Sequence, residues 1–187
     1  MSTSAFAAIV LAGGQGARLG GADKAGIELG GYTLLDRALD ALMDATEIVV
    51  VGDPVPTGVP VTFVREDPKY GGPAAGLLTG LASLAGDPAS VVVLAVDMPR
   101  VTPRTIRRLR RAATGHDGGV LVDGRGRRQL AMCLDVAMLR AAAPTYELWH
   151  GLAMRQLLAP LDLAEVAALG EEARDVDTWA DLRDLRT

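Results

Sequence analysis

Four apolar runs of strand length, separated by segments with helical periodicity, constrain the fold of this chain more than any other feature. Strands are predicted at Phe6–Ala12, Glu47–Val51, Val59–Val64 and Val91–Val96, and helices at Thr33–Met43, Pro73–Ala85 and Pro103–Ala113. Such alternation is typical of a mostly parallel α/β sheet, because parallel strands need helix-length crossovers. The near-continuous valine of VVVLAV indicates a central strand covered on both faces. The sequence therefore predicts a three-layer α/β/α sandwich.

The pattern changes after Gly115, where the predicted elements become shorter. The segments GGVLVDGRG and RRQLAMCLD predict an antiparallel hairpin around a glycine-rich turn. Further helices are predicted at Val136–Ala142 and Gly151–Leu158, a strand at Leu161–Ala168, and a last helix from Thr178. The proline-rich stretch GDPVPTGVP is interpreted as a connector between strands, too short to link two domains. We expect residues 1–187 to form one domain with an antiparallel C-terminal part.

Charge and cysteine content exclude several classes of protein. The formal net charge of -4 argues against a general nucleic-acid binder, which would carry a basic excess. The single cysteine, Cys133, excludes an intramolecular disulfide and is interpreted as a small buried apolar residue. No apolar stretch reaches membrane-spanning length, and the short apolar run at the N-terminus has no basic flank. We therefore expect a soluble cytoplasmic protein with no nucleic-acid or membrane partner.

A glycine-rich segment, GGQGARLGG, directly follows the first predicted strand. Turns of this kind direct several backbone N–H groups to one point and bind phosphate, although a tight turn without a ligand has the same composition. Two familiar phosphate loops are excluded. The Walker A pattern fails because Lys24 is followed by Ala25, and the dinucleotide fingerprint fails because Leu19 stands where its third glycine belongs.

Two cations, Arg18 and Lys24, lie within this loop segment. Like charges so close together repel unless an anion lies between them, and an arginine fork beside a lysine suits a polyphosphate. The segment therefore predicts a nucleoside triphosphate site. Asp23 is interpreted as a residue that orients Lys24 or caps the following turn.

Asp97 is the second candidate site residue. It follows the valine-rich strand and precedes Pro99, which ends the strand. The carboxyl ends of parallel strands form the ligand crevice of an open sheet, so Gly13 and Asp97 are expected at the same edge. A carboxylate beside a triphosphate predicts Mg²⁺, whereas a turn or cap residue is the alternative.

The segment GGPAAGL opens a predicted helix and is rich in small residues. Small residues over Gly72–Gly76 would let a flat base or a pterin ring approach the backbone. Close packing between helix and sheet accounts for the same composition, and the sequence leaves the two interpretations open.

Four motifs, LAGGQGARLGGADK, EDPKYGGPAAGL, LAVDMP and DVDTWADL, closely resemble the molybdenum cofactor guanylyltransferases, the MobA family of nucleotidyltransferases. The first motif is specific to the superfamily, and GPxAG points to the guanylyl branch. Cytidylyl relatives typically carry Ala-Ala-Gly in place of Ala12-Gly13-Gly14 and lack GPxAG. The resemblance implies a Rossmann-like α/β/α nucleotidyltransferase sandwich.

The resemblance also implies roles for individual residues. The backbone at Leu11, Ala12, Gly13 and Gly14 would meet the guanine nucleotide, Lys24 its phosphates, and Asp67 the nucleoside, while Asp97 would bind both nucleotide and Mg²⁺. Gly52, followed by Asp53, occupies a nucleotide-binding position at which the family often has asparagine. Asp175, Asp177 and Trp179 replace the late family motif Asn-x-Asn-Thr-Pro, so Asp177 is either a second metal contact or part of a helix cap. The family's Gln-Pro-Leu stretch remains only as Gln129-Leu130, which leaves the pterin contacts unassigned.

The implied reaction is attack by the terminal phosphate of molybdopterin, or of its molybdenum form, on the α-phosphorus of GTP. A phosphate monoester is already anionic, so His116 and His150 are interpreted as surface or packing residues rather than as bases. Catalysis would depend on positioning and on charge stabilisation by Arg18, Lys24 and Asp97 with Mg²⁺.

Two functions rival guanylyl transfer to molybdopterin, and the partners are those that guanylyl transfer implies. The rivals are a nucleotidyltransferase for another base or acceptor, such as cytidylyl transfer to molybdopterin or transfer to a sugar phosphate, and a non-catalytic nucleotide- or cofactor-binding module. The implied partners are GTP, molybdopterin or Mo-molybdopterin, and molybdoenzyme apoproteins or other cofactor-biosynthesis proteins.

Overall fold

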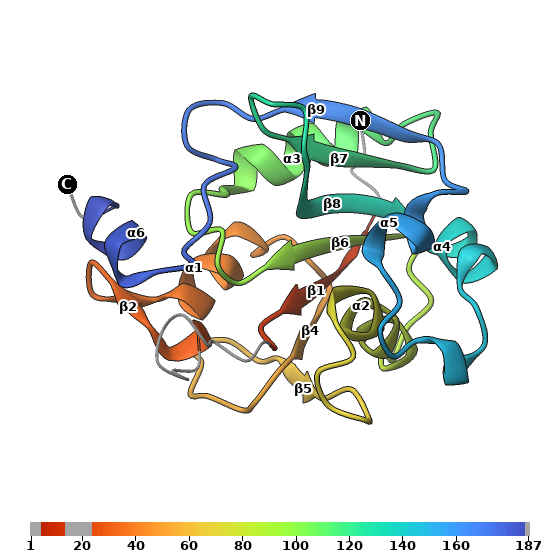
Figure 1. Ribbon diagram of the computed structural model, residues 1–187, viewed down its shortest axis with the longest axis horizontal. Coiled ribbons are helices and arrows are strands. Elements are labelled where there is room, and N and C mark those ends of the chain that lie inside the picture. Colours follow the sequence, from red (N-terminus) through yellow and green to blue (C-terminus); the bar gives the residue numbers. More distant parts are fainter. Residues whose placement is uncertain (1–4, 14–23, 186–187) are drawn as a thin grey trace.

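A seven-stranded sheet crosses the middle of the molecule, with helices on both faces (Figure 1). The computed structural model describes residues 5–13 and 24–185. The strand order is β5-β4-β1-β6-β8-β7-β9. The strands are β1 (Ala7–Leu11), β4 (Glu47–Val51), β5 (Thr62–Val64), β6 (Ser90–Ala95), β7 (Gly118–Val122), β8 (Arg128–Asp135) and β9 (Leu163–Ala167). The alternation of the sequence therefore predicted the sheet correctly.

The strand directions confirm a mostly parallel sheet with an antiparallel C-terminal part. β1 pairs in parallel with β4 on one side and with β6 on the other. β8 runs antiparallel to both β6 and β7, so the predicted hairpin is present. β9 returns parallel to β7, and β8 is the strand of this sheet that runs against its neighbours among the described residues.

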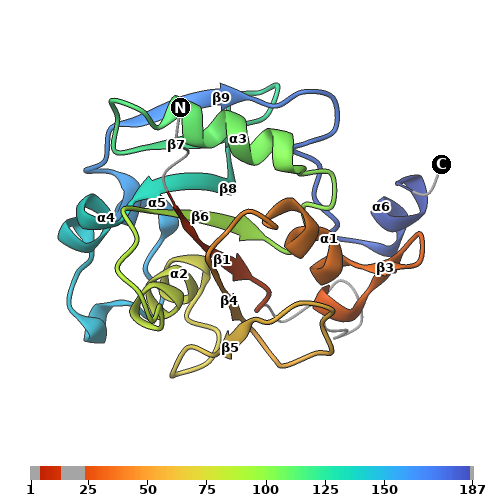
Figure 2. The same cartoon turned by 180° about the vertical axis from the view of Figure 1, so that it is seen from behind.

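The three layers are separated by two hydrophobic clusters, one on each face of the sheet. Helices α1 (Leu34–Ala41) and α3 (Pro103–Ala112) cover one face, and α2 (Pro73–Ala82), α4 (Val136–Ala142) and α5 (Met154–Leu158) cover the other (Figures 1 and 2). β1 serves both clusters, because alternate strand residues point to opposite faces. Its Ala8 and Val10 belong to the first cluster, and Ile9 and Leu11 to the second.

Three helices begin at N-cap threonines that the sequence carries. Thr33, Thr102 and Thr178 are N-caps whose hydroxyls accept from the backbone three residues later, in capping-box geometry. Thr178 thereby starts α6 (Trp179–Asp184), whose Leu182 joins the first cluster. The helix predicted from Thr33 begins one residue later because a cap residue is not itself helical.

Several short elements were absent from the sequence prediction. A hairpin of β2 (Glu28–Leu29) and β3 (Tyr32–Thr33) turns through Gly30 and Gly31, both at positive φ, and follows a 3₁₀ turn, η2 (Lys24–Gly26). A second 3₁₀ turn, η3 (Tyr146–Leu148), precedes α5. The Gly-Gly pair is a hairpin signal, because type I′ turns need positive φ at both central residues. Among the described residues, the helices are too short or too polar to cross a membrane.

Candidate active site

The candidate site lies where the connections leave the sheet in opposite directions. After β1 the chain proceeds to β4 on one side, and after β5 it crosses back to β6 on the other side of β1. A crevice forms at such a switch point, outside the carboxyl ends of the strands. The Val96 N–H donates to the Leu11 carbonyl at 3.0 Å, which holds the two strand ends together. Gly13 and Asp97 each stand two residues past these ends, as predicted.

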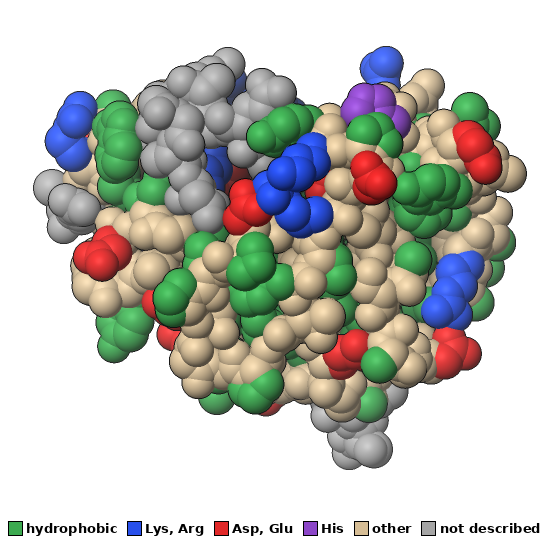
Figure 3. Space-filling view, turned by 90° about the horizontal axis from the view of Figure 1, so that it is seen from below, with side chains coloured by type: hydrophobic (Ala, Val, Ile, Leu, Met, Phe, Trp, Pro, Cys, Tyr) green, Lys and Arg blue, Asp and Glu red, His purple; other side chains and the backbone are tan. Residues whose placement is uncertain are grey.

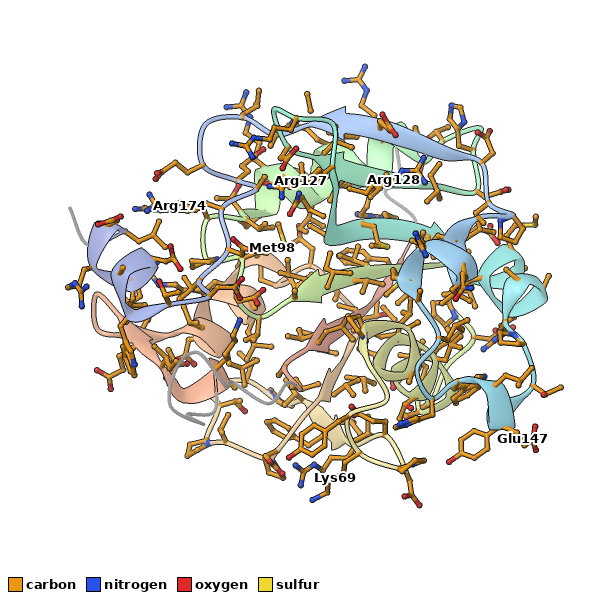
Figure 4. All side chains as sticks on the ribbon, in the orientation of Figure 1. Lys69, Met98, Arg127, Arg128, Glu147 and Arg174 are labelled. Carbon is orange, nitrogen blue, oxygen red and sulfur yellow. The ribbon has the colours of Figure 1, made fainter. Side chains whose placement is uncertain are left out.

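A cavity of about 350 Å³ opens at this edge. The described residues that line it are Leu11, Gly13, Val51, Glu66, Tyr70, Gly72, Pro73, Gly76, Ala95, Asp97 and Leu130. In Figure 4, Met98 marks the end of β6, and Lys69 marks the loop after β5 at the rim of the molecule. Figure 3 shows the molecule from below, where acidic and basic side chains lie next to one another beside hydrophobic ones. The cavity therefore combines apolar walls with a few charged groups, as ligand sites commonly do.

Lys24 connects two carboxylates that are far apart in the sequence. Its ammonium donates to Asp97 Oδ2 at 2.8 Å and to Asp177 Oδ1 at 2.9 Å. The Val176 N–H donates to the Asp97 carbonyl at 2.8 Å, which ties the segment before α6 to the end of β6. The fold thus brings the glycine-loop lysine, the strand-end aspartate and the late aspartate to one point.

Among the described residues, the carboxylates around Lys24 shift its pKa and that of a neighbouring aspartate. Partial burial acts to lower the pKa of Lys24, but the hydrogen bonds that its ammonium donates to Asp97 and Asp177, with the charges of these carboxylates, outweigh burial, and the pKa is raised. The pKa of Asp175 is also raised, first by burial and then by the charges of Asp177 and Asp97. Two carboxylates, Asp97 and Asp177, accept hydrogen bonds from the Lys24 ammonium among the described residues. Carboxylate oxygens are the ligands that Mg²⁺ prefers.

The donor set is small for a metal centre formed by protein alone. Within residues 5–13 and 24–185, there is no cluster of three or more His, Cys, Asp or Glu side chains with metal-site geometry. Mg²⁺ ordinarily takes one or two carboxylates and completes its shell with phosphate oxygens and water. Asp97 and Asp177 fit that smaller requirement.

The backbone at the end of β1 borders the main cavity in part. Leu11 and Gly13 line the cavity, whereas Ala12 is buried. The N–H groups of Ala12 and Gly13 both donate to the Val51 carbonyl, at 2.9 and 2.8 Å. These two donors are therefore engaged within the sheet edge. Gly14 and Arg18, with the rest of residues 14–23, lie outside the described residues.

Gly52 has a packing reason for being glycine. A Cβ there would lie 3.0 Å from the Ala12 Cβ and 3.3 Å from the Gly13 nitrogen. Its neighbour Asp53 forms an ion pair with Arg65 at the surface. The position therefore brings backbone, rather than a side chain, close to the end of β1.

Glu66 and Asp67, two neighbouring residues after β5, border two cavities, and of the two only Glu66 borders the main one. Asp67 is exposed and borders a second cavity formed with Tyr146, Trp149 and His150, and its carbonyl accepts from the Tyr146 hydroxyl at 2.6 Å. Glu66 lines that cavity and also the main one. The family resemblance singled out Asp67 for the nucleoside. Strand periodicity gives no information about the direction of side chains in the loop that follows β5.

Contacts in the structure bear on two alternatives that the sequence left open, at the late motif and at the glycines of α2. The cap of α6 is Thr178, while the Asp177 side chain contacts Lys24, so the late motif contributes both a cap and a site carboxylate. A Cβ on Gly76 would lie 3.3 Å from Leu11 Cδ2, and one on Gly80 only 2.7 Å from Ile9 Cγ2. These glycines of α2 therefore serve helix–sheet packing. Gly72 and Gly76 both line the main cavity, and a Cβ on Gly72, at φ 93, would meet no atom within 4 Å.

Tyr70 is a cavity residue that the sequence analysis missed. It is the non-glycine residue with positive φ, 64°, among those described, and its side chain is 56% exposed. A bulky residue in this conformation is an outlier that often marks a functional loop. Its position before two glycines is the signal that could have indicated a special turn.

Comparison with known proteins identifies the family. The model of the MobA-like NTP transferase domain matches residues 8–167, most of the chain. The chain belongs to the MobA-like NTP transferase family. A molybdenum cofactor guanylyltransferase of Mesorhizobium japonicum is 37% identical over 153 residues, 77% of this chain, and one of Cereibacter sphaeroides is 32% identical over 184 residues, 86% of this chain and 95% of that protein.

The chain spans less than two thirds of the length of several relatives. The match covers 66% of the M. japonicum protein and 59% of a probable molybdenum cofactor guanylyltransferase from Natronomonas pharaonis. Among solved structures, Rv0371c of Mycobacterium tuberculosis superposes with a TM-score of 0.77 at 21% identity and covers 99% of each chain. A second structure of Rv0371c is described as a complex with manganese. At this identity the superposition shows the MobA-like fold.

Proposed function

We propose that this protein transfers GMP from GTP to the terminal phosphate of molybdopterin, or of its molybdenum form, and releases pyrophosphate. The observation that carries the proposal is the junction of Lys24, Asp97 and Asp177 at the switch-point crevice of a MobA-like chain. The relatives named as guanylyltransferases support guanine as the base and the cofactor as the acceptor.

The proposed chemistry needs no general base, because the attacking phosphate is already anionic at neutral pH. Lys24 would bind the phosphates and stabilise the charge that develops on pyrophosphate, together with Arg18. Asp97, with Asp177 beside it, would hold Mg²⁺, which supplies charge neutralisation at the phosphates when bound. The crevice orients the two substrates and limits their approach to one direction.

The proposed setting follows from the proposed reaction. Mg²⁺ is the proposed physiological ion, and the manganese reported for Rv0371c is consistent with a divalent cation in this fold. The cytoplasm is the proposed compartment, and molybdoenzyme apoproteins are the proposed recipients of the product.

Pyrophosphate release tests the proposal directly. The protein is incubated with GTP, Mg²⁺ and molybdopterin, and each component is omitted in turn. We expect release only when all three are present. Release with a sugar phosphate in place of molybdopterin would favour the rival transferase. Tight GTP binding with no release under any condition would favour a non-catalytic binding module.

A further inference from the structure

Two carboxylates line the main cavity. Among the described residues that line it, Glu66 and Asp97 carry the charges. Glu66 follows β5 and Asp97 follows β6, and β4 and β1 lie between those strands. Three strand spacings amount to about 14 Å, so one elongated ligand lying across the end of β1 would reach both carboxylates.

The two carboxylates differ in their partners. Asp97 is held by Lys24, whereas no hydrogen bond or ion pair joins the Glu66 side chain to another residue of segments 5–13 and 24–185. A Cβ placed on Gly13 would lie 3.8 Å from each carboxylate oxygen of Glu66. The half-buried carboxylate thus lies against the end of β1 with acceptor capacity available to a ligand.

The surroundings of Glu66 suit a flat ring. Leu11 and Val51 provide apolar wall, and Gly72, which also lines the cavity, has open space where a Cβ would be. Tyr70 lines the same cavity with a largely exposed ring on a backbone fixed at positive φ. An aromatic side chain beside an apolar slot favours stacking of a planar ligand.

We propose that Glu66, and not Asp67, is the specificity residue that accepts hydrogen bonds from the 2-amino-4-oxopyrimidine edge of the bound ligand, in the first place guanine. This edge carries an N–H and an adjacent amino group, and one carboxylate accepts from both. Cytosine and adenine present a ring acceptor beside their amino group, which a carboxylate repels. The assignment rests on the proposed function and deepens it, since the phosphates then lie toward Lys24 and the base toward Glu66.

The pterin ring has the same edge, so the experiment must separate guanine from pterin. Binding of GTP, of inosine triphosphate, which lacks the 2-amino group, and of 6-hydroxymethylpterin is measured calorimetrically with Mg²⁺ for the unmodified protein and three variants. Glu66→Gln tests the proposal, and Asp67→Asn tests the neighbouring candidate. Glu165→Gln on β9 is the control, because it removes one exposed, ion-paired carboxylate that does not line the cavity.

We expect Glu66→Gln to weaken GTP binding by about tenfold to 100-fold, because hydrogen bonds to a charged acceptor are lost, and to bring the GTP and inosine triphosphate affinities together. Glu165→Gln should keep the original ratio. If only pterin binding weakens in Glu66→Gln, Glu66 recognises the 2-amino-4-oxopyrimidine edge of the pterin rather than that of guanine. An unchanged ratio and unchanged pterin binding in Glu66→Gln would overturn the proposal, as would a ratio lost only in Asp67→Asn. Failure of the proposed function is a different result, in which the unmodified protein binds GTP selectively but releases no pyrophosphate with molybdopterin.

Discussion

At the scale of single residues, Asp97 makes both a side-chain contact and a backbone contact at the site. Its side chain binds Lys24, and its carbonyl holds the C-terminal segment through Val176. Asp97→Asn keeps the volume and the backbone contact but loses the negative charge. We expect the fold to remain and single-turnover transfer to fall by about 100-fold or more, as when a group that stabilises transition-state charge is removed. Rates over a Mg²⁺ titration, with circular dichroism as the folding control, provide the test, and near-normal turnover at limiting Mg²⁺ would refute the assignment.

Burial of Cys133 is expected to suppress the reactivity of its thiol. Its side chain lies inside β8 at 2% exposure, and burial raises the pKa of the thiol to about 11. The thiolate is the reactive form, so the native protein should not react with a disulfide reagent such as Ellman's reagent at pH 8. One equivalent should react in denaturant. Rapid reaction of the native protein would show that β8 is open to solvent.

At the scale of elements, Glu172 joins α3 to the segment after β9. Its carboxylate accepts from Thr105 Oγ1 at 2.7 Å, from Arg108 Nη1 at 2.7 Å and from the Leu169 N–H at 2.8 Å. Burial acts to raise the pKa of Glu172, but these hydrogen bonds outweigh it, and the pKa lies below its ordinary value of 4.5. The carboxylate therefore stabilises the fold fully above about pH 4.5, and this contribution is lost as the pH falls through the folded-state pKa.

Glu172→Gln tests that contribution. We expect the free energy of unfolding at pH 7 to fall by about 1–3 kcal/mol, because a charged acceptor with several donors is replaced. The difference from the unmodified protein should shrink as the pH is lowered below 4. Glu171→Gln, at an exposed neighbour, should change stability by less than about 0.5 kcal/mol. Urea denaturation across this pH range measures both, and an equal loss at every pH would contradict the role of the charge.

Also at this scale, the sequence predicted long elements better than short ones. Runs such as that of β6 are buried on both faces, so their apolar character is unambiguous. β2 and β3 contain two residues each, too few for a period, and only Gly30-Gly31 signals their turn. Cap chemistry at Thr178 was foreseen as a helix start, while the contact between Asp177 and Lys24 depends on residues 153 positions apart.

At the scale of the whole molecule, topology explains which parts of the site could be predicted. A parallel sheet gathers the carboxyl ends of its strands, so Gly13 and Asp97 could be placed together from the sequence alone. Which of Glu66 and Asp67 lines the main cavity could not be predicted, because it depends on the backbone path of a loop that includes Tyr70 at positive φ. Local propensity does not determine which of two adjacent loop side chains faces a cavity.

The central claim concerns the whole molecule, that this MobA-like sandwich joins a guanine nucleotide to molybdopterin. The most direct measurement is mass spectrometry of the product formed from equimolar GTP, CTP and ATP with Mg²⁺ and molybdopterin in one mixture. We predict a single new species with the mass of molybdopterin plus GMP, formed together with pyrophosphate. A cytidine or adenine dinucleotide as the main product, or no dinucleotide at all, would contradict the account.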